Sequence, residues 1–194
     1  MLRALTLLLV VGACSLWTPT LAAQNPPPAR GEIAAQFMPA PEDLPPGFVH
    51  QTDQDEITEA DHSVLQTRTY IRQNPAVGPN DVTGLEIVIG VSDSTAEAAD
   101  VYQRLIAAWR DEGFTFEPFP GSLGQEAVQG RHVLRPDAAR QEEEVLIFWR
   151  TGSINAAVGW SDFADLPNRD DALAVAQRMA PRIAANPTPD LPPR

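Results

Sequence analysis

The residues of this sequence whose types could support catalysis or metal binding are three histidines and several acidic clusters. His50 and His62 flank an acidic stretch, and calcium binds such oxygen ligands when they recur at fixed offsets around a glycine. Read as an EF-hand loop from Asp53, the stretch places Thr58 at the glycine position and Val64 at the final glutamate position. An EF-hand is therefore excluded. We expect a solvated acidic loop, with no metal and no cofactor.

The sequence shows no arrangement typical of a catalytic nucleophile. Ser153 lies in RTGSIN, where Gly-Ser is ordinary chemistry for the tip of a hairpin. PGSLGQ lacks the G-x-S-x-G spacing, and neither a Walker loop nor a G-x-G-x-x-G loop is present. His132 in GRHVL is typical of a half-buried structural histidine. The carboxylates of QEEEV at 141–145 precede a strand and are expected in water, so no catalytic residue is assigned.

The segment VLIFWRTGSINAAVGW at 145–160 predicts a β-hairpin whose first strand is apolar on both faces. Its Gly-Ser step predicts a two-residue turn, which places Arg150 opposite Asn155 and Phe148 opposite Ala157. The face of the hairpin opposite to these pairs carries the larger apolar side chains, and we expect it in the core beneath the helices. Its residues are Val145, Ile147, Trp149, Ile154, Ala156, Val158 and Trp160.

The face that carries Phe148 is the candidate binding surface. Its large residues lie beside small ones, which predicts a shallow groove, and arginine and tyrosine are favoured at such surfaces. A neighbouring hairpin in the same sheet would add three more residues, which gives the full candidate set: Arg68, Tyr70, Arg72, Phe148, Arg150 and Asn155. Two alternatives stay open. An external partner or ligand covers this face, or the chain does so with its segment 32–44 or its Pro-rich tail.

The elements predicted before this hairpin include two alternating strands, a helix and a further strand at 125–134. Apolar and polar residues alternate at 63–72 and 84–91, which is the pattern of paired β-strands. STAE at 94–97 is a capping box, in which the Ser94 hydroxyl accepts from a backbone amide one turn later. Gly113 is a typical helix stop. We therefore expect a helix between these two residues, packed on the sheet.

A second helix is expected from Asn168 to about Ala185. Asn168 can cap it, and the two aspartates that follow suit the positive end of the helix dipole. Pro181 lies inside the apolar pattern of this segment. Because proline has no backbone N–H, we expect it to kink the helix or to end it near Met179.

These elements predict an α+β fold, with an antiparallel sheet and two helices packed on one face. The single domain is expected at 36–185. A signal peptide at 1–23 and a Pro-rich spacer at 24–35 precede it, and a Pro-rich tail at 186–194 follows it.

Three motifs carry a resemblance to a known group of proteins. DLPPGF, SLGQEA and the hairpin VLIFWRTGSINAAV, followed by an Ala-rich helix, resemble small bacterial secreted proteins and lipoproteins with an LPPGF turn and an LG-x-EA element. The group has no assigned activity, so the resemblance implies a fold and a compartment but no catalytic residue. The order of elements is also similar to the PsbP/Mog1-like sandwich, on fold alone.

The N-terminus predicts export. MLR, an apolar run and TPTLAAQ have the order of a secretory signal peptide, with cleavage after Ala22 or Ala23. The alternative is a lipobox at VGAC, in which Cys14 would become a lipid anchor. Cys14 is the only cysteine, so ordinary cleavage would leave no disulfide. No transmembrane span is expected in the mature chain.

Charge and motifs together define two hypotheses of function. A net charge of −12 makes nucleic acid and anionic membranes poor partners, because both need a basic footprint. The leading hypothesis is an exported, periplasmic or extracellular, non-catalytic module. It would bind an envelope protein or a small anionic or amphipathic ligand on the Phe148 face. The alternative is an envelope hydrolase whose site the sequence does not reveal.

Overall fold

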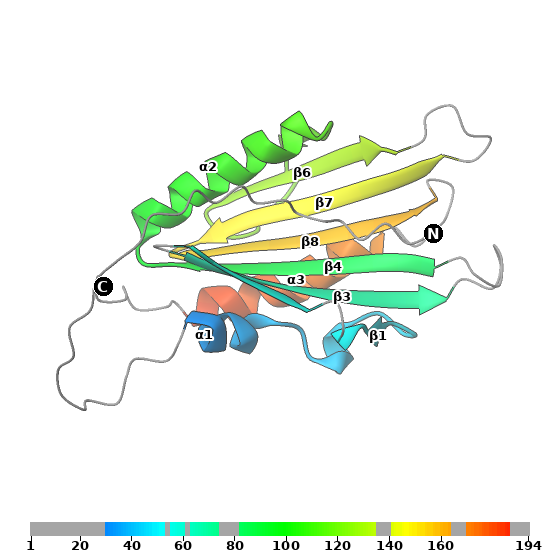
Figure 1. The fold of residues 1–194 in the computed structure, drawn as a ribbon, viewed down its shortest axis with the longest axis horizontal. Coiled ribbons are helices and arrows are strands. Elements are labelled where there is room, and N and C mark those ends of the chain that lie inside the picture. Colours follow the sequence, from blue (N-terminus) through cyan, green and yellow to red (C-terminus); the bar gives the residue numbers. More distant parts are fainter. Residues whose placement is uncertain are drawn as a thin grey trace.

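The computed structural model describes residues 30–52, 55–60, 63–73, 82–134, 141–163 and 170–186. Its centre is an eight-stranded antiparallel sheet in the order β1-β3-β4-β8-β7-β6-β5, with β2 paired to β3 beside β1 (Figure 1). The strands are β1 (Val49–His50), β2 (Glu56–Ala60), β3 (Ser63–Gln73), β4 (Val82–Ser92), β5 (Thr115–Pro118), β6 (Glu126–Val133), β7 (Glu142–Thr151) and β8 (Ile154–Phe163).

Helices cover both faces of this sheet. On one face lies α2 (Thr95–Asp111), and on the other lie α1 (Arg30–Phe37) and α3 (Asp170–Ala185), with a short 3-10 turn, η1 (Pro41–Asp43), after α1. The predicted α+β class, antiparallel sheet and single domain are confirmed. The placement of the helices differs, because α2 and α3 lie on opposite faces. Strands that are apolar on both faces require cover on both.

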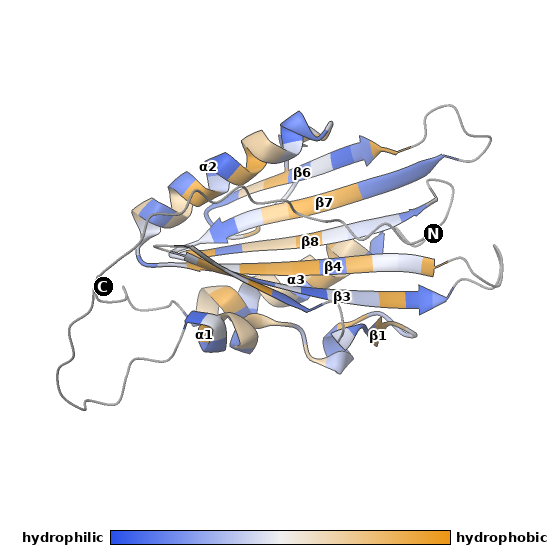
Figure 2. Cartoon of the chain, viewed as in Figure 1, coloured by the Kyte–Doolittle hydropathy of each residue, from blue (hydrophilic) through white to orange (hydrophobic). Residues whose placement is uncertain are grey.

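The helix α2 forms as its sequence predicts. The Ser94 side chain accepts a hydrogen bond from the Glu97 backbone N–H at 3.1 Å, and Gly113 follows the helix with φ of 104°. One stripe of α2 is buried against the sheet, where it meets Val88, Leu146 and Phe148. Figure 2 shows how hydrophobic residues concentrate in β4 and β7, in the middle of the sheet.

The opposite face holds the larger core. The predicted core residues of the hairpin lie here, and Trp149 and Trp160 are almost completely buried under α1 and α3. The segment Arg30–Phe37 also packs on this face through Ile33, Phe37 and further residues. The packed core therefore includes residues that were predicted to lie in the Pro-rich spacer at 24–35. The spacing of Ile33 and Phe37 is that of one helical face.

Pro181 does not end α3, which continues to Ala185. Met179 and Ile183 on either side of the proline are fully buried, so packing holds this turn in place. Because Pro181 has no N–H, the backbone carbonyl of Gln177 receives no helical hydrogen bond from it.

Candidate functional site

The six predicted site residues lie on both faces of the sheet rather than on one. Phe148 pairs with Ala157 beneath α2, and Arg150 and Asn155 share that face. In β3, Tyr70 pairs with Leu85, whose side chain lies in the core under α1 and α3. Because directly paired residues share a face, the β3 residues among the six point away from Phe148. The prediction chose the wrong face of β3.

The Phe148 face is part of the core and not an open surface. Phe148 is 1% exposed, and its ring is stacked on Tyr102 with centroids 4.5 Å apart. The ring of Trp109 meets it edge-on at 5.0 Å. The cover comes from α2, which neither alternative had named. The segment 32–44 instead packs on the opposite face, and the tail at 187–194 lies outside the described residues.

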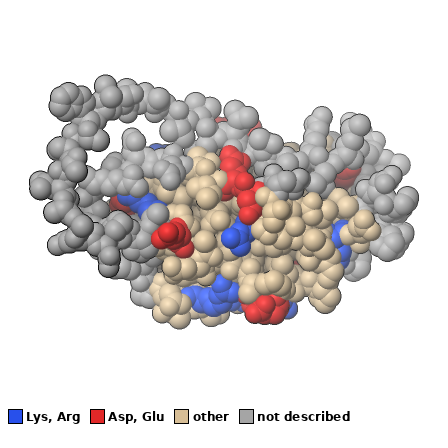
Figure 3. Space-filling model, turned by 60° about the horizontal axis from the view of Figure 1, so that its bottom comes forward, with Lys and Arg blue, Asp and Glu red and all other residues tan. Residues whose placement is uncertain are grey.

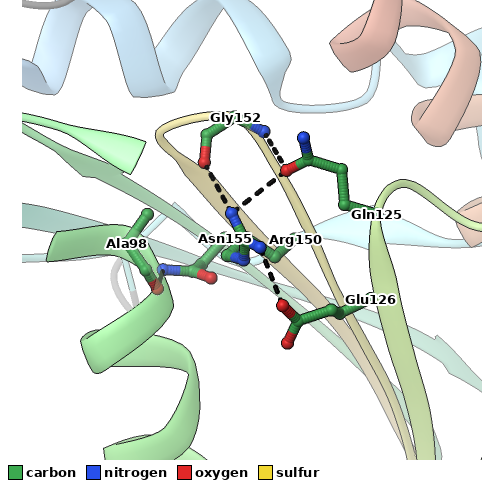
Figure 4. Close-up of polar contacts among 6 residues, drawn as sticks. All are labelled: Ala98, Gln125, Glu126, Arg150, Gly152 and Asn155. Atoms are coloured by element: carbon green, nitrogen blue, oxygen red, sulfur yellow. Dashed lines mark hydrogen bonds and ion pairs between the residues drawn. The ribbon is translucent and has the colours of Figure 1, made fainter. Parts of the chain in front are cut away.

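Arg150 ties the tip of the hairpin to the beginning of β6 (Figure 4). Its Nη1 donates to Gln125 Oε1 at 3.0 Å and to the Gly152 carbonyl at 3.3 Å, while Nη2 donates to Glu126 Oε1 at 2.7 Å. On the same face, Asn155 Nδ2 donates to the Ala98 carbonyl of α2 at 3.0 Å. Arg150 and Asn155 therefore hold the fold together at this end of the sheet.

Arg72 has a similar role on the other face. Its guanidinium lies over the ring of Phe48 at 4.5 Å, and its Nη2 is 2.6 Å from Asp171 Oδ2 at the beginning of α3. Gly47, in the PPGF turn, has φ of 88°, and a Cβ there would lie 3.2 Å from the Arg72 side chain. Figure 3 shows the molecule from the α1 side, where acidic and basic side chains lie next to each other on a largely uncharged surface.

Two histidines form pairs with carboxylates. His50 Nε2 lies 2.6 Å from Asp55 Oδ1, beside the ring of Tyr70 at 5.0 Å, and Arg68 Nε lies 3.8 Å from Asp55 Oδ2. Burial raises the pKa of Tyr70, and the neighbouring arginine offsets part of the increase. A histidine oriented by a carboxylate can act as a general base when a nucleophile lies within reach.

The second pair is His132 Nδ1 and Glu144 Oε2, 3.2 Å apart. Burial raises the pKa of Glu144, and its bond to the histidine lowers it in part. His132 is thus half-buried, as predicted, and it joins β6 to β7. His62 lies outside the described residues, as do Asp53 and Asp61 of the acidic stretch before it.

An uncovered part of the sheet lies elsewhere, beside α3. On this face α3 packs on β7 and β8 and α1 packs on β3 and β4, so no described helix covers β5 and β6. The register shows which described residues of β5, β6 and β7 face this uncovered strip: Thr115, Glu117, Ala127, Gln129, Arg131, Glu143 and Val145. We call the depression between this strip, α3 and the segment 119–124 the α3 groove.

Three adjoining hollows make up the α3 groove. The first, of about 410 Å³, lies between the hairpin tip and the C-terminal half of α3. The second, of about 230 Å³, shares Leu123 and Gln177 with the first. The third, of about 350 Å³, shares Gln129 and Val145 with the second. Each hollow therefore adjoins the next, and together they follow α3 and cross β6.

Most of the charged residues that line the α3 groove are acidic. Arg131 is 55% exposed, and its Nε lies 2.5 Å from Glu143 Oε1 while Nη2 donates to Oε2 at 3.0 Å. Glu143 is only 1% exposed, so an exposed arginine holds a buried carboxylate in a two-point contact. Glu117, which accepts from Gln129, and Asp170 add further carboxylates.

Comparisons of the chain with protein-family models, curated proteins and solved structures find no match. The resemblance to the LPPGF group therefore stays a prediction. In the part of the chain that the structure describes, no group of three metal-ligating side chains is close enough to hold an ion. None of the described helices has the length and apolar character that a membrane crossing needs.

The α3 groove was not predicted from the sequence. One signal was present, because Gln129 and Arg131 alternate with Val128 and Gly130 in β6, which makes one face of that strand polar. The walls come from segments far apart in the chain, and spacing alone does not bring such segments together.

Proposed function

We propose that this protein is an exported binding module that takes an extended, amphipathic ligand of the cell envelope in the α3 groove. The observation that carries the proposal is the row of three adjoining hollows along a strip of this sheet face that no described helix covers. Ligand sites are commonly concave, with apolar walls and a few directed polar groups. The export pattern of residues 1–23 supports the compartment.

The lining of the α3 groove suits an extended chain better than a compact molecule. Apolar walls are provided by Phe119, Ile147 and Leu173 in the middle hollow. Polar side chains, among them Gln129 and Arg131, follow on the floor toward the third hollow. An extended ligand presents alternate side chains to opposite sides, so it can place apolar groups on the wall and polar groups on the floor.

Charge favours a ligand with hydrogen-bond donors or positive groups. The sequence-based expectation of an anionic ligand rested on Arg68 and Arg150, which are now engaged with Asp55 and Glu126. The only described arginine that lines the groove, Arg131, is neutralised by a buried carboxylate. A net charge of −12 also disfavours the approach of anions at low salt.

The test is selection of linear peptides from a random library with the purified chain, followed by affinity measurement on substituted proteins. Gln129→Trp fills the point that the second and third hollows share, and it should weaken peptide binding by at least about tenfold. Gln103→Trp, at an exposed position of α2, is the matched control and should leave the affinity unchanged. Equal affinities for the two variants would contradict a site in the α3 groove.

A second candidate function has one observation in its favour. The 2.6 Å contact between His50 and Asp55 is that of a general base with its orienting carboxylate. An envelope hydrolase would then act at the β1 edge, beside Tyr70. Hydrolysis of a simple aryl ester that is lost in His50→Asn, and kept in His132→Asn, would favour this candidate over the binding module.

A further inference from the structure

The first hollow of the α3 groove has features that the proposed function does not use. It lies between the hairpin tip and the turn of α3 that contains Pro181. We infer that this hollow is a subsite for an alkylammonium group, such as a lysine side chain or an amino terminus of the bound chain. The inference rests on the proposed function of the α3 groove and names the chemistry that one end of its ligand would carry.

A backbone carbonyl of α3 lacks its usual helical donor at this hollow. Gln177 and Pro181 both line it, and they are separated by the four positions of a helical hydrogen bond. Because Pro181 has no N–H, it cannot donate to the Gln177 carbonyl, and in the proposed subsite this carbonyl accepts from the ammonium group. In a helix interior proline is destabilising, so its presence here has a cost that a ligand contact would offset.

A side-chain oxygen offers a second acceptor. Thr151 Oγ1 is buried and has no hydrogen-bond partner among the described residues, and Thr151 lines the same hollow. Gly124 makes the close approach on this wall possible. Its φ is 62°, and a Cβ there would lie 2.3 Å from the Arg150 carbonyl oxygen and 2.4 Å from Thr151 Oγ1. Such an unpartnered buried oxygen is unfavourable until a donor reaches it.

The electrostatics of the hollow favour a positively charged hydrogen-bond donor. No charged side chain is among its described lining residues. The last turn of α3 forms part of the wall through Ala184, and the carbonyl end of a helix carries partial negative charge. Arg182, the basic residue of that turn, is bound to Asp43 and the Met38 carbonyl instead. An ammonium group has three donors, and Leu123 and Ala180 provide an apolar wall for its alkyl stem.

The test compares two probes of similar length and opposite charge. The purified chain is titrated with n-butylammonium and with n-butyrate, and the backbone amide signals are followed by NMR. Butylammonium should give saturable shifts at Gly124, Thr151 and Ala180, and butyrate should not. Absence of saturable shifts at these amides, or equal shifts with butyrate, would overturn the inference.

Variants of the two acceptors sharpen the test. Pro181→Ala returns a backbone donor to Gln177, so it should weaken butylammonium binding about tenfold while raising the melting temperature. Thr151→Val should weaken it similarly, whereas Thr115→Val, in the third hollow, should have no effect. Unchanged affinity in both Pro181→Ala and Thr151→Val would refute the subsite.

The outcomes separate this inference from the proposed function. If Gln129→Trp abolishes peptide binding but butylammonium does not reach the first hollow, the groove function stands and the subsite is wrong. If butylammonium binds as expected and peptide affinity is unaffected by Gln129→Trp, the subsite stands and the extended groove is wrong.

Discussion

The ring of Tyr102 on α2 is stacked on the ring of Phe148 on β7, with centroids 4.5 Å apart. This contact closes the sheet face that the sequence had marked as a binding surface. Burial raises the pKa of Tyr102 to about 12, which is consistent with a ring enclosed between helix and sheet. The sheet therefore has a core on each side, and its uncovered strip lies at the β5–β6 end.

Removal of the Phe148 ring should destabilise the protein strongly. The ring is 1% exposed and touches two aromatic rings of α2, so Phe148→Ala should lower the free energy of unfolding by about 3–5 kcal/mol. Chemical denaturation measures this change. Ile57→Ala, at a side chain 56% exposed, is the control and should change it by less than about 0.5 kcal/mol. A loss below about 1 kcal/mol for Phe148→Ala would mean that α2 does not cover this face.

Reversal of the charge at Arg150 should also destabilise the fold. Arg150→Glu removes three hydrogen bonds and places a carboxylate beside Glu126, so we expect a loss of about 2 kcal/mol or more. The sequence alone placed Arg150 on an exposed binding surface, where such a change would cost little. Arg104→Glu, on a side chain 69% exposed, is the matched control in the same denaturation experiment. Similar stabilities for the two variants would show that the network in Figure 4 contributes little.

Glu86 should make stability depend on pH. Burial, with Glu144 and Glu56 nearby, raises the pKa of Glu86 to about 8 from an ordinary value of 4.5. The folded state then holds its proton more tightly than the unfolded chain. The stabilising contribution is complete below pH 4.5 and is lost as the pH rises through about 8.

Glu86→Gln isolates this contribution. The variant should match the parent in acid and be the more stable of the two above pH 8, as read from thermal melts at a series of pH values. Glu32→Gln, at an exposed position of α1, should follow the parent throughout. A constant difference between Glu86→Gln and the parent across the series would contradict the raised pKa.

The export prediction is open to a direct measurement. Residues 1–23 have the order of a signal peptide, so N-terminal sequencing of the exported protein should begin at Ala23 or Gln24. A membrane-bound form with a blocked N-terminus at Cys14 would establish the lipoprotein alternative instead. A chain that keeps Met1 would contradict both.

The sequence predicted elements that have strong local signals. The hairpin turn between Arg150 and Asn155, the cap at Ser94 and the core position of Trp149 all agree with the structure. Each of these features depends on neighbours within a few positions along one element. Such patterns are informative because turn geometry and helix capping restrict the backbone locally.

The sequence could not place elements that meet only in space. In β3 both faces mix polar and apolar residues, so the pattern does not tell which face lies under which helix. The pairing of Tyr70 with Leu85 places Tyr70 on the face under α1 and α3. The cover of Phe148 by Tyr102 depends on which side of the sheet the chain crosses after β4. The α3 groove likewise depends on where no helix lies, which periodicity does not reveal.

The most direct test of the central claim is hydrogen exchange of the purified chain with and without a peptide selected for binding to it. The α3 groove predicts that protection on binding appears in residues 119–131 and 170–184, and that α2 is unaffected. Protection confined to α2, or to the β1 and β2 edge beside His50, would contradict the claim and place the binding surface elsewhere.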